Sequence, residues 1–251
     1  MIPLLLLGAA LAREPALHPA DFTGPPPLKP TATLESPQAG AAGAVSAGVT
    51  LHVILQALPK QVDGREVDTP ESKRCREQAV STVLHSGVRA VVAEGNALRG
   101  SLAAPQPIPP GTGPNIGAVL ADYQGVQVYG FELPAVEERW RLRMTQMRDA
   151  AADLTALRTA PLDDRTKLAR LEGIQRDFYA AQTEFVVGAV PLRSFLALET
   201  ALAVAAHRDL DEIFLILGSV HWPDIPHALQ TADRLGSDRF VGLRILRYEC
   251  R

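Results

Sequence analysis

The segment Ile213–His221 reads IFLILGSVH and combines an unbroken apolar run with a glycine and a histidine. An apolar run of five residues without polar alternation is typical of a strand that is buried on both faces. Such strands belong to parallel sheets, in which helices cover both sides. Gly218 ends the run and permits a sharp turn, so we expect His221 to project from the loop beyond the strand.

Strands and helices alternate along the rest of the chain. Further strands are predicted at Val49–Leu55, Val88–Ala93, Val126–Phe131 and Phe240–Tyr248. Helices are predicted at Pro70–Ser86, capped by Thr69 and stopped by Gly87, at Ile116–Tyr123 and at Ile225–Leu235. This order predicts an α/β fold whose mainly parallel central sheet is covered by helices on both faces.

A long helical stretch interrupts the alternation before the fourth strand. Residues 134–209 carry helical periodicity throughout, with Asp163 as a cap and a last helix from about Pro191 to His207. We expect this insertion to form a helical arm. Its stripe of Trp140, Met144 and Met147 indicates helix packing rather than a cofactor site.

The first 48 residues differ in composition from the rest of the chain. Residues 1–12 form a short apolar run that ends in Ala10-Leu11-Ala12, which suits a cleaved signal peptide and a periplasmic or secreted protein, although no basic residue precedes it. The run is too short to span a bilayer, so membrane association is not expected beyond export. Residues 13–48 are rich in Pro, Ala and Gly and are predicted to be a disordered tether, which leaves residues 49–251 as a single domain.

Charge and aromatic content bear on the binding partners, and cysteine content bears on disulfide formation. A net charge of −3 and an aromatic content of 5% give no basic or base-stacking surface, so no nucleic-acid partner is expected. Cys75 and Cys250 are the only cysteines. They either form one disulfide in an oxidising compartment or stay as two free thiols, and the sequence leaves both readings open.

Three ionisable residues follow predicted strands. Glu94, Glu132 and His221 each lie at a carboxyl end, where ligands gather in open α/β sheets. If the strands are neighbours, the three groups meet in one cleft, where they could bind a divalent metal or share acid and base roles. Taken singly, each could instead cap a turn or a helix or bond a loop carbonyl. Arg193 either faces this cleft, holding a carboxylate or a substrate, or is an exposed helix arginine.

The same residues resemble a known superfamily. The buried strand with its Gly218–His221 element, the strand ending in Glu94, the segment ending in Glu132 and the upstream Arg193 are similar to the superfamily of ChaN, TraB, Tiki and the erythromycin esterases. The resemblance covers roughly Val49 to the carboxyl terminus. It implies an α/β sheet with a helical arm and either metal-dependent hydrolysis, with His221, Glu94 and Glu132 as ligands, or haem binding.

One departure from the superfamily pattern bears on activity. The first strand of such proteins ends in its own histidine, whereas here it is followed by Gln56 and Ala57, and His52 lies near the wrong end of the strand. We therefore expect either an exported hydrolase acting on a small molecule or peptide, with Glu94, Glu132, Arg193 and His221 as catalytic residues, or a degenerate protein that binds haem or a partner protein. A structural envelope protein is a third reading. The sequence fixes neither the cofactor nor the oligomeric state.

Overall fold

Six strands form one central sheet in the order β1-β10-β2-β9-β5-β8. The structure is a computed structural model that describes residues 17–35, 48–56, 60–62, 65–67, 69–113, 115–235 and 240–250. The strands are β1 (Pro30–Glu35), β10 (Arg244–Glu249), β2 (Thr50–Gln56), β9 (Glu212–Gly218), β5 (Ala90–Ala93) and β8 (Gln127–Tyr129). Two small hairpins, β3 (Lys60–Val62) with β4 (Arg65–Val67) and β6 (Arg99–Ser101) with β7 (Ala104–Gln106), were not predicted.

The sheet is mainly parallel, as the sequence predicts. All pairs among β10, β2, β9, β5 and β8 are parallel, and only β1 runs antiparallel, along β10. Strand β9 lies between β2 and β5 although it follows both in the chain, and its pairing with β2 runs from Thr50 with Glu212 to Gln56 with Gly218. The strands that precede Glu94, Glu132 and His221 are therefore neighbours, β5, β8 and β9.

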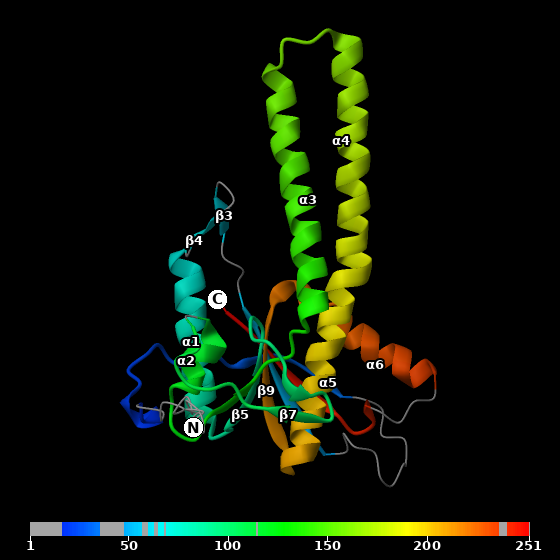
Figure 1. Cartoon of the computed structure of the whole chain (residues 1–251). Helices are drawn as coiled ribbons and strands as arrows, with labels where there is room; N and C mark the ends of the chain where they lie inside the picture. The colour runs from blue at the N-terminus through cyan, green and yellow to red at the C-terminus, as the bar shows by residue number, and fades with distance from the viewer. Residues whose placement is uncertain are drawn as a thin grey trace, which may run out of the picture.

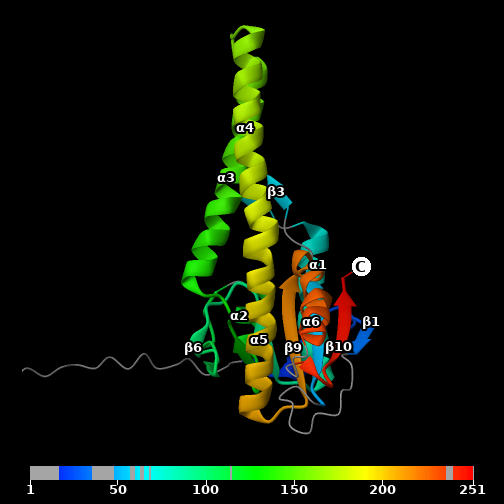
Figure 2. The same ribbon diagram turned by 90° about the vertical axis from the view of Figure 1, so that its right-hand side faces the viewer.

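Helices cover both faces of the sheet (Figure 1), which confirms the predicted fold class; Figure 2 looks onto one of the covered faces. Helices α1 (Pro70–Ser86) and α2 (Ile116–Ala121) pack on one face, and α5 (Val190–Arg208) and α6 (Asp224–Arg234) pack on the other. Alternate side chains of β9 enter the two cores: Leu215 faces α5, and Phe214 faces α1. This is why the run of residues 213–217 shows no polar alternation.

Helix α1 has the ends that its sequence predicts. The Thr69 hydroxyl accepts from the Ser72 amide, and the Ser72 hydroxyl accepts from the Thr69 amide, so two otherwise free amides are satisfied. Gly87 ends the helix with φ 84°, a left-handed conformation that glycine adopts without steric cost.

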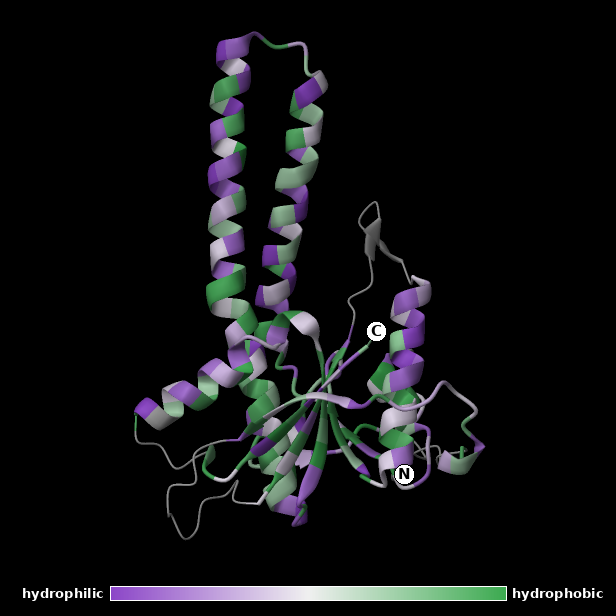
Figure 3. Ribbon diagram, turned by 180° about the vertical axis from the view of Figure 1, so that it is seen from behind, coloured by the Kyte–Doolittle hydropathy of each residue, from purple (hydrophilic) through white to green (hydrophobic). Residues whose placement is uncertain are grey.

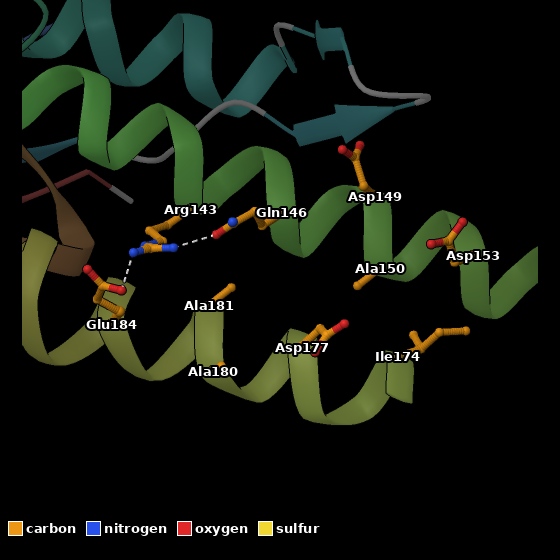
Figure 4. Close-up of a pocket in the computed structure, with 10 residues that line it drawn as sticks. All are labelled: Arg143, Gln146, Asp149, Ala150, Asp153, Ile174, Asp177, Ala180, Ala181 and Glu184. Atoms are coloured by element: carbon orange, nitrogen blue, oxygen red, sulfur yellow. Dashed lines mark hydrogen bonds and ion pairs between the residues drawn. The ribbon is translucent and has the colours of Figure 1, made fainter. Parts of the chain in front are cut away.

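The predicted helical insertion forms an arm that projects away from the sheet (Figure 1). Helices α3 (Pro134–Thr159) and α4 (Asp164–Glu184) lie side by side and antiparallel. Few of their side chains are buried, and the arm mixes polar and apolar residues where the sheet is apolar (Figure 3). Small residues such as Ala150 and Ala181 face a polar cavity of about 420 Å³ between the helices, near the Arg143–Glu184 ion pair (Figure 4).

Helix α4 passes into α5 without a loop. A π-helical turn, η2 (Phe185–Ala189), joins them, and the Val190 amide donates to the Phe185 carbonyl five residues back. The predicted helix from about Pro191 to His207 therefore agrees with α5 to within one residue at each end, and the finding that the sequence did not predict is its unbroken junction with α4. The wider turn accommodates Pro191, which has no amide hydrogen to donate. The continuous stretch Asp164–Arg208 is long and apolar enough to cross a membrane, but 61% of its most apolar window is buried inside the fold.

Part of the predicted tether is folded. Strand β1 pairs with β10, Leu17 forms a β-bridge with Tyr123, and the rings of Phe22 and Tyr123 make an edge contact at 6.2 Å. An edge strand of mostly exposed residues forms through backbone hydrogen bonds to its neighbour. Its sequence therefore has no hydrophobic pattern that predicts a strand. The predicted signal peptide, residues 1–12, and residues 36–47 of the tether lie outside the described residues.

Cys75 and Cys250 form a disulfide, which decides between the two readings of the sequence. Their Cα atoms are 5.2 Å apart, within the usual range for a disulfide. The bond joins the first half of α1 to the residue after β10, across 175 residues of sequence.

Candidate functional site

Neighbouring strands bring the three predicted ionisable residues together at the carboxyl edge of the sheet. Glu94 directly follows β5, Glu132 lies three residues beyond β8, and His221 ends a 3-10 turn, η3 (Ser219–His221), that follows β9. Nε2 of His221 lies 3.3 Å from Oε1 of Glu94. The hypothesis that two carboxylates and an imidazole converge at this edge therefore agrees with the geometry.

Arg193 joins the two carboxylates. Helix α5 places its buried guanidinium at the strand ends, where Nη2 lies 3.2 Å from Oε1 of Glu94 and also donates to Oε1 of Glu132. The reading of Arg193 as an exposed helix arginine was wrong. Because one nitrogen serves both acids, Arg193 holds the carboxylates in place rather than offering a free charge to a substrate.

The surroundings of Glu94 favour the ionised form of its carboxylate. Its Oε2 accepts from the Gly218 amide at 2.5 Å, while Oε1 faces His221 and Arg193. Burial alone would raise the pKa of Glu94, but the hydrogen bond and charge of His221, with Arg193 and the Gly218 amide, hold it below its usual value. Its side chain is 17% exposed, the most accessible of the cluster.

Glu132 lies in the opposite electrostatic environment. Burial raises the pKa of Glu132 despite the bond to Arg193 and the Gly95 amide that donates to Oε1 at 3.2 Å. The two acids thus share one guanidinium while their surroundings shift their pKa values apart. Divergent pairs of this kind are common where one carboxyl stays charged and the other stays protonated.

Two residues that the sequence reading missed extend the cluster beyond His221. Nδ1 of His221 lies 2.8 Å from the Ser194 hydroxyl, which in turn lies 2.8 Å from Oδ2 of Asp224. A chain of contacts therefore runs from Glu94 through His221 and Ser194 to Asp224. Asp224 begins α6, three residues after His221, and Ser194 follows Arg193, but no sequence spacing separates them from ordinary helix residues.

Trp140 covers the cluster from the base of the arm. The Arg193 guanidinium lies 4.0 Å from the centroid of its ring, and the His221 ring stacks on it at 5.8 Å. Phe185 of the π-helical turn packs on Trp140 at 4.4 Å. Trp140 is a packing residue, as predicted, and it packs against the polar cluster. Because the indole ring covers His221, the His221 side chain is 0% exposed.

The cluster does not fit the predicted metal site. Across the described part of the chain, no group of three or more His, Cys, Asp and Glu side chains is placed to hold a metal ion. The guanidinium of Arg193 bonds both Glu94 and Glu132, where a cation shared by those carboxylates would have to bind. We therefore derive no chemistry through a metal held by His221, Glu94 and Glu132.

His52 lies away from the cluster, as expected from its place near the start of β2. Its Nδ1 lies 2.9 Å from the Tyr248 hydroxyl, its Nε2 lies 3.5 Å from Glu212 at the start of β9, and its ring contacts Phe214. The residues directly after β2, where the superfamily pattern places a histidine, are outside the described residues. His52 therefore does not replace that histidine.

The fold and the site define an α/β protein with a buried acid–base cluster at the carboxyl edge of a mainly parallel sheet. No family model matches the chain, and no curated protein or solved structure matches it.

Proposed function

We propose that this protein is a hydrolase of the superfamily of ChaN, TraB, Tiki and the erythromycin esterases, with His221 as its general base. The observation that carries the proposal is the contact chain in which His221 touches Glu94 through one ring nitrogen and Ser194 through the other. A base held by a carboxylate on one side and facing a hydroxyl on the other is the arrangement that activates nucleophiles in many hydrolases.

The proton positions follow from counting donors and acceptors. Glu94 is ionised and can only accept, so Nε2 of His221 carries a hydrogen, and in the neutral ring Nδ1 then has a lone pair. The Ser194 hydroxyl has one hydrogen and three acceptors within reach, which are Nδ1 of His221, Oδ2 of Asp224 and the Val190 carbonyl; in the arrangement that makes His221 a base, it donates to Nδ1. His221 is thereby ready to take a proton from, or through, Ser194.

Asp224 completes the chain after that transfer. Once Nδ1 carries a hydrogen, it donates to the Ser194 oxygen, and the Ser194 hydroxyl is free to donate to Oδ2 of Asp224. A water at Ser194 can pass a proton to the hydroxyl as the hydroxyl passes its own to His221. The hydroxide left behind attacks the substrate, and Glu94 stabilises the imidazolium that forms.

Arg193 and Glu132 act through Glu94 in this proposal. Arg193 neutralises Glu94 and fixes its orientation toward His221, and Glu132 holds the other side of the guanidinium. Both are positioning residues, because both side chains are buried away from a substrate in this arrangement.

A hydrolysis screen with matched variants tests the proposal. Nitrophenyl esters, anilides and phosphoesters are incubated with the wild type, with His221→Gln and Ser194→Ala, and with the exposed controls His207→Gln and Ser219→Ala. We expect turnover by the wild type and both controls, and a loss of about 100-fold or more in kcat/KM for His221→Gln. Equal turnover by His221→Gln, or none by any form, would sink the proposal.

A second candidate is a non-catalytic protein that binds haem or a partner protein. The ion pairs that Arg193 makes with both Glu94 and Glu132 favour it, since a purely structural cluster would show the same pairing. A Soret band on haem titration, together with a negative hydrolysis screen, would support this candidate over the first.

A further inference from the structure

An apolar groove lies between helices α5 and α6, beside the cluster. It encloses about 590 Å³, within the range of about 300–1,000 Å³ that is usual for small-molecule sites. Leu198, Ile225 and Phe240 form a buried floor, and the exposed side chains of Phe195 and Leu235 stand at the rim. Exposed large apolar side chains around a concave apolar floor are typical of a binding site.

The polar residues of the groove are few. Ser194, Asp224, His227 and Thr231 line it, with no lysine or arginine among the described lining residues. Oδ2 of Asp224 lies 2.8 Å from the Ser194 hydroxyl, and no ion pair joins Asp224 to a basic side chain in the described part of the chain. The groove therefore presents one unneutralised carboxylate beside a large apolar surface.

We infer that this groove binds an amphipathic small molecule whose apolar body lies on Leu198, Ile225 and Phe240 and whose cationic head group donates to Asp224. The apolar walls select a chain or ring through burial, and the carboxylate selects a donor of positive charge over an anion. An amine fits this polarity, whereas a fatty acid would place its carboxylate against Asp224.

The same polar residues connect the groove to the cluster. Ser194 and Asp224 line the groove and also form the outer half of the chain that starts at Glu94 and His221. A head group on Asp224 thus lies next to the hydroxyl that faces the general base. As a substrate site the groove rests on the proposed function, whereas ligand binding itself does not.

Competition binding tests the inference without any turnover. Nile red, a neutral dye whose emission reports an apolar environment, is bound to the full chain and displaced with octylamine, octanol or octanoate. We expect octylamine to compete at a concentration at least about tenfold below that of octanoate. The apparent Kd should fall about fourfold for each CH₂ added between hexylamine and octylamine.

Three variants locate the binding. Asp224→Asn should keep dye binding and abolish the preference for octylamine over octanoate. Thr231→Trp, at an exposed position that lines the groove, should block the dye, and Gln230→Trp, on the same helix but outside the lining, should not. Circular dichroism confirms that each variant is folded.

Several outcomes would overturn the inference. The inference fails if octylamine does not displace the dye, or if octanoate competes as well as octylamine. It also fails if a folded Thr231→Trp variant binds the dye like the wild type. Octylamine binding without any hydrolysis would refute the proposed function and leave the ligand site standing. Hydrolysis without octylamine binding would refute the ligand site and leave the proposed function standing.

Discussion

Nε2 of His221 lies 3.3 Å from Oε1 of Glu94, although the two residues are 127 positions apart in the sequence. The contact exists because β9 inserts beside β5, so that the loops after the two strands open at the same edge of the sheet. A conservative change at Glu94 is therefore the most direct test of the cluster.

Glu94→Gln should lower kcat/KM by about 100-fold or more, because the neutral amide no longer stabilises the imidazolium of His221. Hydrolytic activity is assayed at several pH values with a substrate found in the hydrolysis screen. Glu138→Gln, an exposed change on α3, serves as the control. Equal loss in both variants would mean that the effect is not specific to the cluster.

Arg193→Met should destabilise the protein by about 3–5 kcal/mol, because it leaves Glu94 and Glu132 buried without their shared partner. Glu132→Gln should cost less, since burial already favours the neutral form of this side chain. The double variant Arg193→Met/Glu132→Gln should be more stable than Arg193→Met alone. Urea unfolding measures all three, and a strictly additive double variant would contradict the coupling.

His52 should make stability depend on pH. Burial lowers the pKa of His52 below its usual value of 6.5, against the opposing effect of Glu212, so the folded state prefers the neutral ring. The contribution is complete above 6.5 and is lost as the pH falls through the lower folded pKa. Urea unfolding at pH 7.5 and pH 5 should show a smaller stability loss in His52→Gln than in the wild type, with His207→Gln behaving like the wild type.

The disulfide should be a major source of stability. Cys75→Ser/Cys250→Ser should lower the free energy of unfolding by about 2–5 kcal/mol, because the unfolded chain loses a cross-link over 175 residues. Thermal unfolding with and without a reductant gives the same comparison in the wild type. An unchanged Tm under reduction would show that the bond does not form in solution.

Trp140→Ala should expose His221, whose side chain is 0% accessible beneath the indole ring. Diethyl pyrocarbonate, which modifies accessible histidines, should then react at His221, as read by peptide mass spectrometry. Trp140→Phe keeps an aromatic cover and should protect the ring. Modification of His221 in the wild type at the rate of the exposed His207 would contradict the burial.

The sequence predicts the sheet and its helices well, because each depends on local signals. The apolar run at Ile213–Leu217, the cap at Thr69 and the stop at Gly87 act over a few residues, and all three match the structure. The sequence also places Glu94, Glu132 and His221 at one edge, since parallel strands share an edge.

The remaining features depend on contacts between distant segments. Strand β1 has no apolar pattern of its own and forms on the edge of β10, and Arg193 is buried only because the strand ends supply two carboxylates. Ser194 and Asp224 gain their roles from the position of α5 beside α6. The unbroken passage through η2 was also missed, because Pro191 looks like a helix start when read locally.

The unbroken helix from Asp164 to Arg208 has a mechanical consequence. The tip of the arm and the pair Arg193 and Ser194 belong to one continuous helix, and Trp140 belongs to the other helix of the same hairpin. A protein that binds the tip would therefore act on the other end of the same helix, next to His221. It would change the surroundings of His221 without contacting the cluster.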